Sequence, residues 1–474
     1  MRPFRGILCL TAILGATFVV ALAGNGWGWG AQRPPAAPEV IAPPAAETQA
    51  AQASFRMIGA RSCAATACHG SVHRDPRSLG AQASHIRRDE YVVWSDQDPH
   101  ARSLTTLEND RSQQIFAELR ITDGDGKVVD QRAYDNCLAC HATKVTAPVT
   151  GAVSYESVSC EACHGPAQAW RETHFQRHWN PQLAARSGFA QTKSLPVRAM
   201  QCVQCHVGAD DREVNHDLIA AGHPVLKFEL AAYHELLPKH WNDAAERRAD
   251  PGFEGALWKA GQVATISSTL ELTAARVARR SSAAAAADAP VAPVWPEFAE
   301  YDCFACHHDL VDTSWYRPQD KPPQVLAAWN TWNLANVLPG ASKLDELREL
   351  MPRQMRGADE DLLAKLNAAR LSDPTEWLPS GSAAPVADAS RHWDSAAQAY
   401  LQLAARFRQR QDEARAAGQP WPQQAVVKQT LLALRRNLAF DKQHDSPGAH
   451  KAGLRDEIAK QLQTVEQHLS QGGR

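Results

Sequence analysis

The sequence predicts a mainly α-helical protein with few strands, and three observations support this prediction. Apolar residues recur at helical spacing over residues 254–280 and over most of the chain after Pro322. Ten of the eleven cysteines form five pairs, each followed at once by a histidine, and all of them lie within residues 63–307. Residues 31–53 are rich in Pro and Ala and predict an extended tether.

Four of the cysteine pairs have the spacing C-x-x-C-H, and the first has four residues between its cysteines. C-x-x-C-H is typical of covalent haem c attachment. The thiols add to the vinyl groups of the porphyrin, and the histidine binds the iron as its proximal ligand. Zinc ribbons need no histidine after each second cysteine, and redox C-x-x-C motifs occur singly. The motifs therefore predict five covalently bound haem c groups.

The predicted residues of these sites are read directly from the motifs. The attachment cysteines are Cys63 and Cys68, Cys137 and Cys140, Cys160 and Cys163, Cys202 and Cys205, and Cys303 and Cys306. The proximal ligands are His69, His141, His164, His206 and His307.

The N-terminus begins with a short basic stretch, and an almost wholly apolar run follows over residues 6–24. This pattern predicts an export signal with a small-residue cleavage site at Ala21–Ala23. Because the run approaches the roughly 20 residues that span a bilayer, a retained membrane anchor is the alternative. In both cases we expect the remaining chain in the periplasm or on the outer face of the cytoplasmic membrane. The formal net charge of −2 argues against a nucleic-acid binder.

Four segments follow from these patterns. They are a signal peptide or anchor (1–24), a Pro/Ala-rich linker (25–58), a pentahaem domain (59–320) and a helical C-terminal region (321–474). In the haem domain the cofactors supply much of the apolar core, so we expect short helices and long loops around them. Residues 254–280 predict one long helix, followed by a flexible break at 281–293. Further helices are expected over 323–337, 342–355, 358–370, 391–417, 422–439 and 448–470. They form a bundle that covers haems or offers a partner surface.

The second axial ligand of each iron decides whether it only carries electrons or can also bind a small molecule. Methionine is scarce, whereas most of the 19 histidines lie between His69 and His308. Ten histidines of this region remain once the five proximal ligands are set aside, and this pool favours bis-histidine ligation. They are His73, His85, His100, His174, His178, His216, His223, His234, His240 and His308.

Three stretches resemble the cytochrome c-554 family of multihaem cytochromes. They are Trp94-Ser-Asp-Gln-Asp-Pro-His100-Ala101, Ser159-Cys-Glu-Ala-Cys-His-Gly-Pro166 with a histidine soon after, and Val214-Asn-His216-Asp-Leu-Ile-Ala-Ala-Gly-His223-Pro224. The resemblance covers residues 60–310 and implies distal ligands at His100, His174 and His223, and then at His216. His308 directly follows a proximal ligand and could reach a neighbouring haem. The fifth motif, the long first spacer and the C-terminal region depart from the tetrahaem carrier of the family.

The expected function is that of an exported carrier of electrons. Its bis-histidine haems would link respiratory partners such as other cytochromes or a membrane quinol oxidoreductase. The alternative is a multihaem oxidoreductase that acts on a small nitrogen compound at one five-coordinate haem, because the four stronger distal candidates serve five irons. No motif has the C-x-x-C-K form of pentahaem nitrite reductases, and neither Tyr301 nor Tyr233 can be assigned a catalytic role from the sequence.

Overall fold

The structure is a computed structural model of the chain. It describes residues 55–79, 86–147, 149–285, 295–307, 328–355, 361–379, 393–439 and 452–471. The predicted signal or anchor over residues 6–24 and the prolines of the predicted break after residue 285 lie outside these ranges. Within them, no helix is long and apolar enough to cross a membrane.

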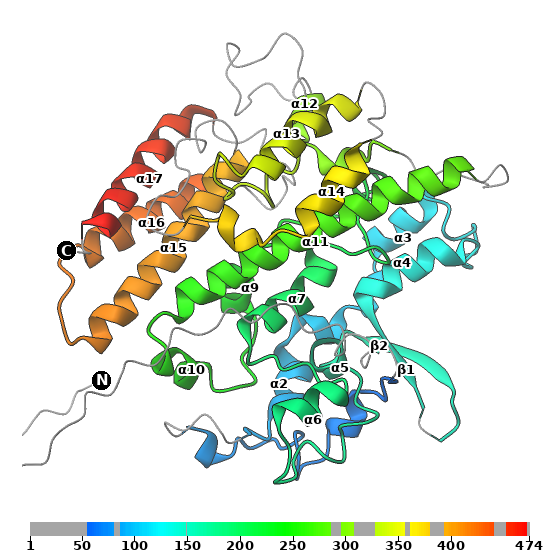
Figure 1. Ribbon diagram of the computed structural model, residues 1–474. Helices are drawn as coiled ribbons and strands as arrows, with labels where there is room; N and C mark the ends of the chain where they lie inside the picture. Colours follow the sequence, from blue (N-terminus) through cyan, green and yellow to red (C-terminus); the bar gives the residue numbers. More distant parts are fainter. Residues whose placement is uncertain are drawn as a thin grey trace, which may run out of the picture. The chain divides into compact units, whose positions relative to one another are not determined.

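The described part of the chain is mainly α-helical, as the sequence predicts (Figure 1). The helices of the region with the cysteine motifs are α2 (Glu90–Gln97), α3 (Asp110–Glu118), α4 (Gln131–His141), α5 (Cys160–His164), α6 (Pro181–Arg186), α7 (Leu195–His206), α8 (His216–Ala220), α9 (Leu230–Leu236), α10 (Asp243–Ala249), α11 (Phe253–Ala285) and α12 (Phe304–His307). Short 3-10 turns include η1 (Ala60–Cys63) and η3 (Pro99–Arg102). As expected, most of these helices are short.

The only sheet among the described residues is a two-stranded antiparallel ribbon. Strand β1 (Ala142–Thr146) pairs with β2 (Val153–Ser157), with Ala142 opposite Ser157. This ribbon joins the second cysteine motif, which ends α4, to the third, which begins α5. Side chains cap the helices near it: Asp130 accepts a hydrogen bond from the Ala133 amide at 3.0 Å at the start of α4.

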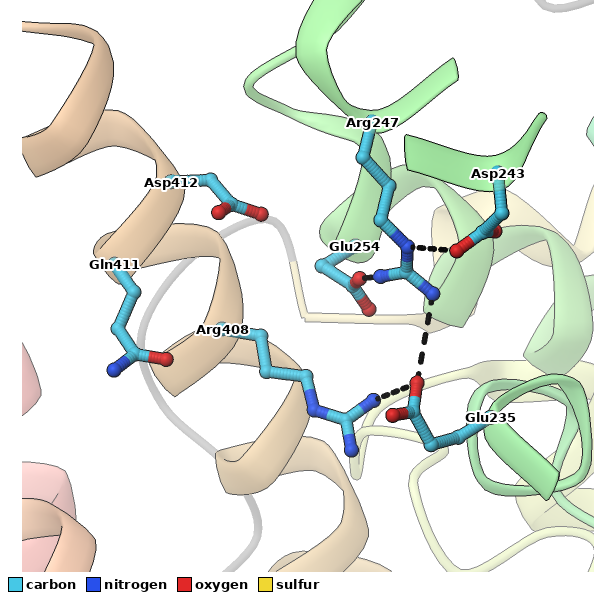
Figure 2. A pocket seen from close by; sticks show the side chains of 7 residues that line it. All are labelled: Glu235, Asp243, Arg247, Glu254, Arg408, Gln411 and Asp412. Carbon is cyan, nitrogen blue, oxygen red and sulfur yellow. Dashed lines mark hydrogen bonds and ion pairs between the residues drawn. The ribbon is translucent and has the colours of Figure 1, made fainter. Parts of the chain in front are cut away.

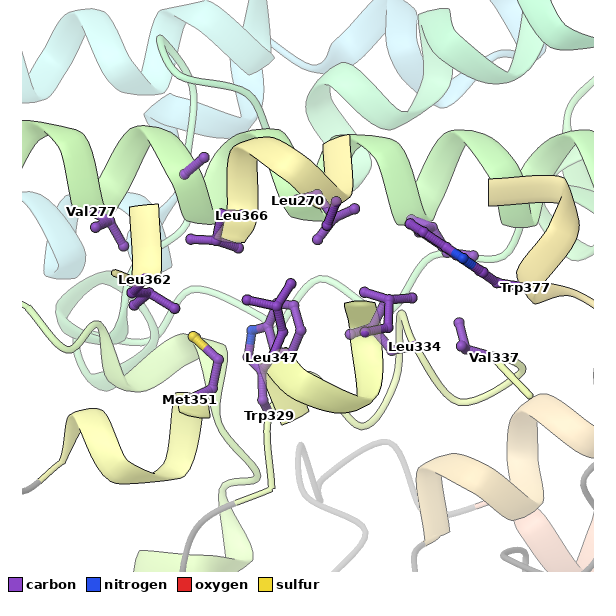
Figure 3. Close-up of a cluster of buried hydrophobic side chains, with 14 of the residues drawn as sticks. Leu270, Val277, Trp329, Leu334, Val337, Leu347, Met351, Leu362, Leu366 and Trp377 are labelled. Carbon is purple, nitrogen blue, oxygen red and sulfur yellow. The ribbon is translucent and has the colours of Figure 1, made fainter. Parts of the chain in front are cut away.

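Helix α11 links the motif region to the C-terminal region. It packs against α7 and α9, and also against α14 and α15. Its apolar residues Leu270 and Val277 belong to a buried cluster with Leu347 and Leu362 (Figure 3). Residues of this cluster come from α11, α13 (Ser342–Gln354) and α14 (Leu362–Arg370). One helix therefore contributes to the cores of both regions.

The last three helices form a second apolar core. They are α15 (Trp393–Ala416), α16 (Gln424–Leu438) and α17 (Arg455–Ser470). Leu403, Leu431 and Leu462 meet between them and are almost fully buried. All three helices lie within the ranges that their helical periodicity predicts, as do α13 and α14.

The prediction of a helix over residues 323–337 is wrong for residues 328–337, the part of this range that the structure describes. These residues form turns, and Trp329 makes an isolated bridge with Tyr301. The indole of Trp329 donates to the Glu300 carboxylate at 3.0 Å, and the indole of Trp332 donates to the Phe228 carbonyl at 2.8 Å. These long-range bonds fix the tryptophans in a non-helical segment, so tertiary contacts override the local periodicity.

An ionic cluster joins α9, α10 and α11 to α15 (Figure 2). Arg247 pairs with Asp243 at 2.8 Å and also with Glu254 and Glu235, and Arg408 of α15 pairs with Glu235 at 2.9 Å. Glu254 is 1% exposed and thus depends on Arg247 for its counter-charge. The residues lining this pocket of about 270 Å³ are acids, arginines and one glutamine, with no cysteine or histidine among them.

Candidate haem-binding sites

Three of the four C-x-x-C-H motifs lie wholly at the end of a helix, and the fourth begins at Cys303, one residue before its helix. Helices α4, α5, α7 and α12 end at His141, His164, His206 and His307 respectively. Residues at positions i, i+3 and i+4 of a helix lie on one face. Both thiols and the imidazole of a motif therefore point to the same side, as binding to a single porphyrin requires.

The first motif reaches its compact form through a turn instead. Cys63 ends η1, and the Cys68 amide then donates to the Ala65 carbonyl at 2.8 Å. The Gly70 amide donates to the same carbonyl at 3.0 Å. A Cβ at Gly70 would lie 1.9 Å from the Ala64 carbonyl oxygen, so glycine is needed after this motif histidine. The longer spacer is thus accommodated by a tight turn that brings Cys68 and His69 back toward Cys63.

Each of the five motif histidines faces a second histidine, and the two ring centroids lie 6.1–6.4 Å apart. Numbered by motif, the pairs are His69–His174 (pair 1, 6.1 Å), His141–His223 (pair 2, 6.4 Å), His164–His240 (pair 3, 6.3 Å), His206–His100 (pair 4, 6.1 Å) and His307–His216 (pair 5, 6.4 Å).

This separation fits two imidazoles that share one iron. With metal–imidazole bonds of about 2.0–2.1 Å and a ring centre about 1.2 Å behind its nitrogen, the centres are expected about 6.4 Å apart. Direct contact of two unliganded rings needs no such uniform spacing, since aromatic pairs span about 4.5–7 Å. The donor set in each pair, one motif histidine and one further imidazole, is that of a bis-histidine haem.

Hydrogen bonds at Nδ1 orient most of these rings. His141 Nδ1 contacts the Ser103 carbonyl at 3.0 Å, His174 Nδ1 the Arg171 carbonyl at 2.8 Å, and His223 Nδ1 the Pro224 carbonyl at 2.8 Å. A carbonyl can only accept, so each of these nitrogens carries the proton. The unprotonated Nε2 is then free to bind a metal.

Carboxylates take the place of the carbonyls at two histidines. His69 Nδ1 donates to Glu90 at 3.1 Å, and His100 Nδ1 donates to Asp98 at 2.8 Å. These hydrogen bonds raise the pKa of both imidazoles. In contrast, burial lowers the pKa of His164 to about 3 and that of His206 to about 4. Burial thereby keeps these two rings in the neutral form that binds metal.

Contacts between the sites connect them in a series. The Cys160 thiol lies close enough to Cys63 to lower the pKa of Cys63, so motifs 1 and 3 are neighbours. The Cys140 thiol lowers the pKa of Cys205 in the same way, so motifs 2 and 4 are neighbours. Burial raises the pKa of Cys163, and the nearby Cys205 adds to this effect, so motifs 3 and 4 are neighbours as well. The contacts place the motifs in the order 1, 3, 4, 2.

The fifth site joins this series at motif 2. His216 begins α8, and His223 of pair 2 follows in the turn after that helix. The Asn215 side chain caps α8 by accepting from the Leu218 amide at 2.9 Å, and the His216 amide donates to Glu297 at 2.8 Å. One short helix and the turn after it therefore place histidines of two different pairs, and pair 5 comes next to pair 2.

The structure places four of the predicted distal histidines, His100, His174, His216 and His223, opposite motif histidines. His308 lies outside the described residues. His240, which the sequence analysis did not choose as a distal ligand, stands opposite His164. The Arg87 guanidinium bonds the carbonyls of Lys239 and Trp241 and so holds the segment with His240 against the N-terminal part of the domain. This contact bridges distant parts of the chain and leaves no local sequence signal.

Other histidines and tyrosines of the region have structural surroundings. His234 is 3% exposed and its Nε2 lies 3.0 Å from Arg198, and His73 and His178 are exposed. The Tyr301 hydroxyl donates to the Met351 carbonyl at 2.9 Å within the core. The Tyr233 hydroxyl donates to the Lys227 carbonyl at 3.4 Å, and its ring packs against His206.

Helical cysteine–histidine motifs, each with an opposing imidazole, define the class of c-type cytochromes. Comparison with known families agrees: residues 63–165 match the family of cytochrome c554 and c-prime. This part of the chain is a cytochrome c554-like domain. The matched part of the chain is therefore similar to c-type cytochromes, which bind haem c covalently and transfer electrons. No curated protein and no solved structure matches the chain.

Proposed function

We propose that the protein is an exported pentahaem cytochrome c that carries electrons through five bis-histidine haems. The observation that carries this proposal is the set of five histidine pairs at metal-sharing distance. An electron carrier needs irons with both axial positions occupied by the protein. Each motif histidine has a facing imidazole that can fill the second position.

The residues of each site have distinct tasks. The two motif thiols would anchor the porphyrin, and the motif histidine and the facing histidine would hold the iron. When bound, the haem iron supplies reversible one-electron chemistry. The backbone carbonyls and carboxylates at Nδ1 fix the ring orientations and make the imidazoles stronger donors. Because both axial positions are filled by protein, small molecules are excluded from the iron.

The contacts between motifs support a continuous path in the order 1, 3, 4, 2, 5. Motif 1 and motif 5 are then its two ends. We propose that one end receives electrons and the other delivers them to a second redox protein, either another cytochrome or a membrane quinol oxidoreductase.

Two observations support export: the covalent attachment of haem c, and the N-terminal apolar run over residues 6–24. A periplasmic protein, or one held on the outer face of the cytoplasmic membrane through this run, is consistent with both. Helices α13 to α17 carry no cysteine, and their cores pack on α11. We propose that they stabilise the haem domain and offer surface to a partner.

The alternative function, oxidation or reduction of a small nitrogen compound, requires one iron with an open position. His240 supplies the fifth facing imidazole that the sequence did not provide. Tyr301 is committed to a buried carbonyl and is not positioned to form a bond to a haem. The geometry therefore favours the carrier over the enzyme.

Two measurements on the purified holoprotein test this proposal. Intact mass and the pyridine haemochrome assay should both give five haems per chain. Titration of the oxidised and reduced protein with nitrite, nitric oxide or hydroxylamine should leave the optical spectrum unchanged. Four or fewer haems, or a saturable spectral change with any of these molecules, would contradict it.

A further inference from the structure

The five pairs differ in the group that forms a hydrogen bond with the Nδ1 atoms of their imidazoles. In pairs 1 and 4 the acceptor at one ring is a carboxylate, Glu90 for His69 and Asp98 for His100. In pair 2 both rings use backbone carbonyls. In pair 3 the His164 Nδ1 has only the Thr192 hydroxyl at 3.5 Å, and the buried Nδ1 of His240 has no hydrogen-bond partner.

The two carboxylates are fixed in place. Glu90 Oε2 accepts from His69, while its Oε1 accepts from the Arg87 amide at 2.6 Å, and its side chain is 17% exposed. Asp98 Oδ1 accepts from both the amide and the ring of His100, and its side chain is 7% exposed.

A carboxylate at Nδ1 changes the imidazole more than a carbonyl does. It pulls the shared proton toward itself, so the ring gains imidazolate character and becomes a stronger donor at Nε2. A stronger axial donor stabilises ferric over ferrous iron, and the reduction potential falls. The effect acts through the ligand that carries the hydrogen bond, so it is local to one site.

We propose that Glu90 and Asp98 are tuning residues that give haems 1 and 4 the two lowest reduction potentials of the protein. This inference rests on the proposed function, because it assumes that the five pairs hold haem iron. In the series 1, 3, 4, 2, 5 one site of higher potential then lies between the two low-potential sites, and two further sites of higher potential follow them. Because His240 Nδ1 has no hydrogen-bond acceptor, haem 3 should have a higher reduction potential than haems 1 and 4 on either side of it.

The first test uses the unmodified holoprotein, in a potentiometric titration followed by electron paramagnetic resonance. The angle between the two ring planes sets the splitting of the iron orbitals, so parallel rings give a rhombic low-spin signal and perpendicular rings a strongly anisotropic one. The rings of pair 1 are 16° apart and those of pair 4 are 84° apart. The two lowest couples should therefore comprise one signal of each type. Two lowest couples of the same type would overturn the proposal, with no variant involved.

The second test replaces each carboxylate by its neutral isostere. Each substitution should raise the midpoint potential of one haem. In Glu90→Gln this is a haem with a rhombic signal, and in Asp98→Asn it is a haem with a strongly anisotropic signal. We expect about a tenfold change in the one-electron equilibrium, which is about 59 mV. The matched control is Asp96→Asn, whose carboxylate accepts from Ser95. It removes the same charge nearby but touches no imidazole.

The outcomes separate this inference from the proposed function. Shifts in the two variants that do not exceed that of the control would overturn the tuning role while leaving five six-coordinate haems intact. A wild-type protein with a high-spin haem or fewer than five haems would overturn the proposed function itself. Haem content and circular dichroism of each variant verify that a shift does not come from lost cofactor or altered fold.

Discussion

The imidazoles of His164 and His240 lie with their centroids 6.3 Å apart and their planes at 73°. His164 ends the short helix α5, whereas His240 stands on a segment between α9 and α10 that Arg87 holds in place. This relationship completes the set of five pairs. In the proposed pentahaem protein, the haem of the third motif would have an open coordination position without this pair, and the protein would be a candidate enzyme.

Replacing His240 by Ala should convert one of the five haems from six- to five-coordinate. The haem content should stay unchanged, because the thiols of Cys160 and Cys163 still anchor it. We expect a high-spin signal of about one haem equivalent, together with new binding of nitric oxide to the oxidised or reduced protein. The control is His73→Ala, since His73 is exposed. A wholly low-spin His240→Ala protein would refute the assignment of this ligand.

Loss of Arg276 should destabilise the protein much more than loss of Arg279, one turn further along α11. Arg276 is 7% exposed and bonds the buried Glu300 at 2.7 Å, just before the fifth motif. Removing it leaves an unpaired buried carboxylate, so Arg276→Ala should lower the free energy of unfolding by about 3–5 kcal/mol. Arg279→Ala breaks ion pairs with the exposed Asp210 and with the partly exposed Glu213, and it should cost about 1 kcal/mol or less. Urea unfolding monitored by circular dichroism gives both values, and equal losses would contradict this account of the ion pair.

The core between α11, α13 and α14 should be similarly sensitive. Leu347 is fully buried in this core, whereas Leu371 after α14 is 90% exposed. Leu347→Ala should lower the free energy of unfolding by about 2–5 kcal/mol through lost burial and the cavity left behind. Leu371→Ala should change it by no more than about 0.5 kcal/mol. A small effect of Leu347→Ala in thermal or urea unfolding would mean that this region does not pack as the structure shows.

Asp75 should contribute stability at neutral pH that disappears in acid. Hydrogen bonds from the Arg77 side chain and amide hold the pKa of Asp75 well below its usual range. An acid with a lowered pKa in the folded state stabilises the fold above its unfolded value of about 3.9, and this contribution is lost as the pH falls through the folded value. Asp75→Asn should therefore be less stable than wild type at pH 7, with a smaller difference at pH 3. A difference that does not depend on pH would rule out the ion pair as its cause.

The sequence alone predicted the mainly helical fold and the helices from α13 to α17, because their apolar periodicity is strong. It failed at residues 328–337, where Trp329 and Trp332 bond distant partners and prevent a helix. The domain boundary at residue 320 stays a prediction, and so does any role of His308.

The site was predictable to different degrees. The cysteines and motif histidines follow from a local pattern, so they could be named without a structure. His100, His174, His216 and His223 were chosen through family resemblance, and the structure places each opposite a motif histidine. His240 could not be chosen, because its position depends on the long-range contact with Arg87 rather than on neighbouring residues.

Electron paramagnetic resonance of the fully oxidised holoprotein, quantified against its haem content, tests the central claim most directly. Five histidine pairs predict five low-spin ferric haems, with two signals of the parallel-ring type from pairs 1 and 5 and three of the perpendicular type. A high-spin signal that accounts for about one haem of the total would contradict the claim, and the iron with the open position would then have to be found among the five sites.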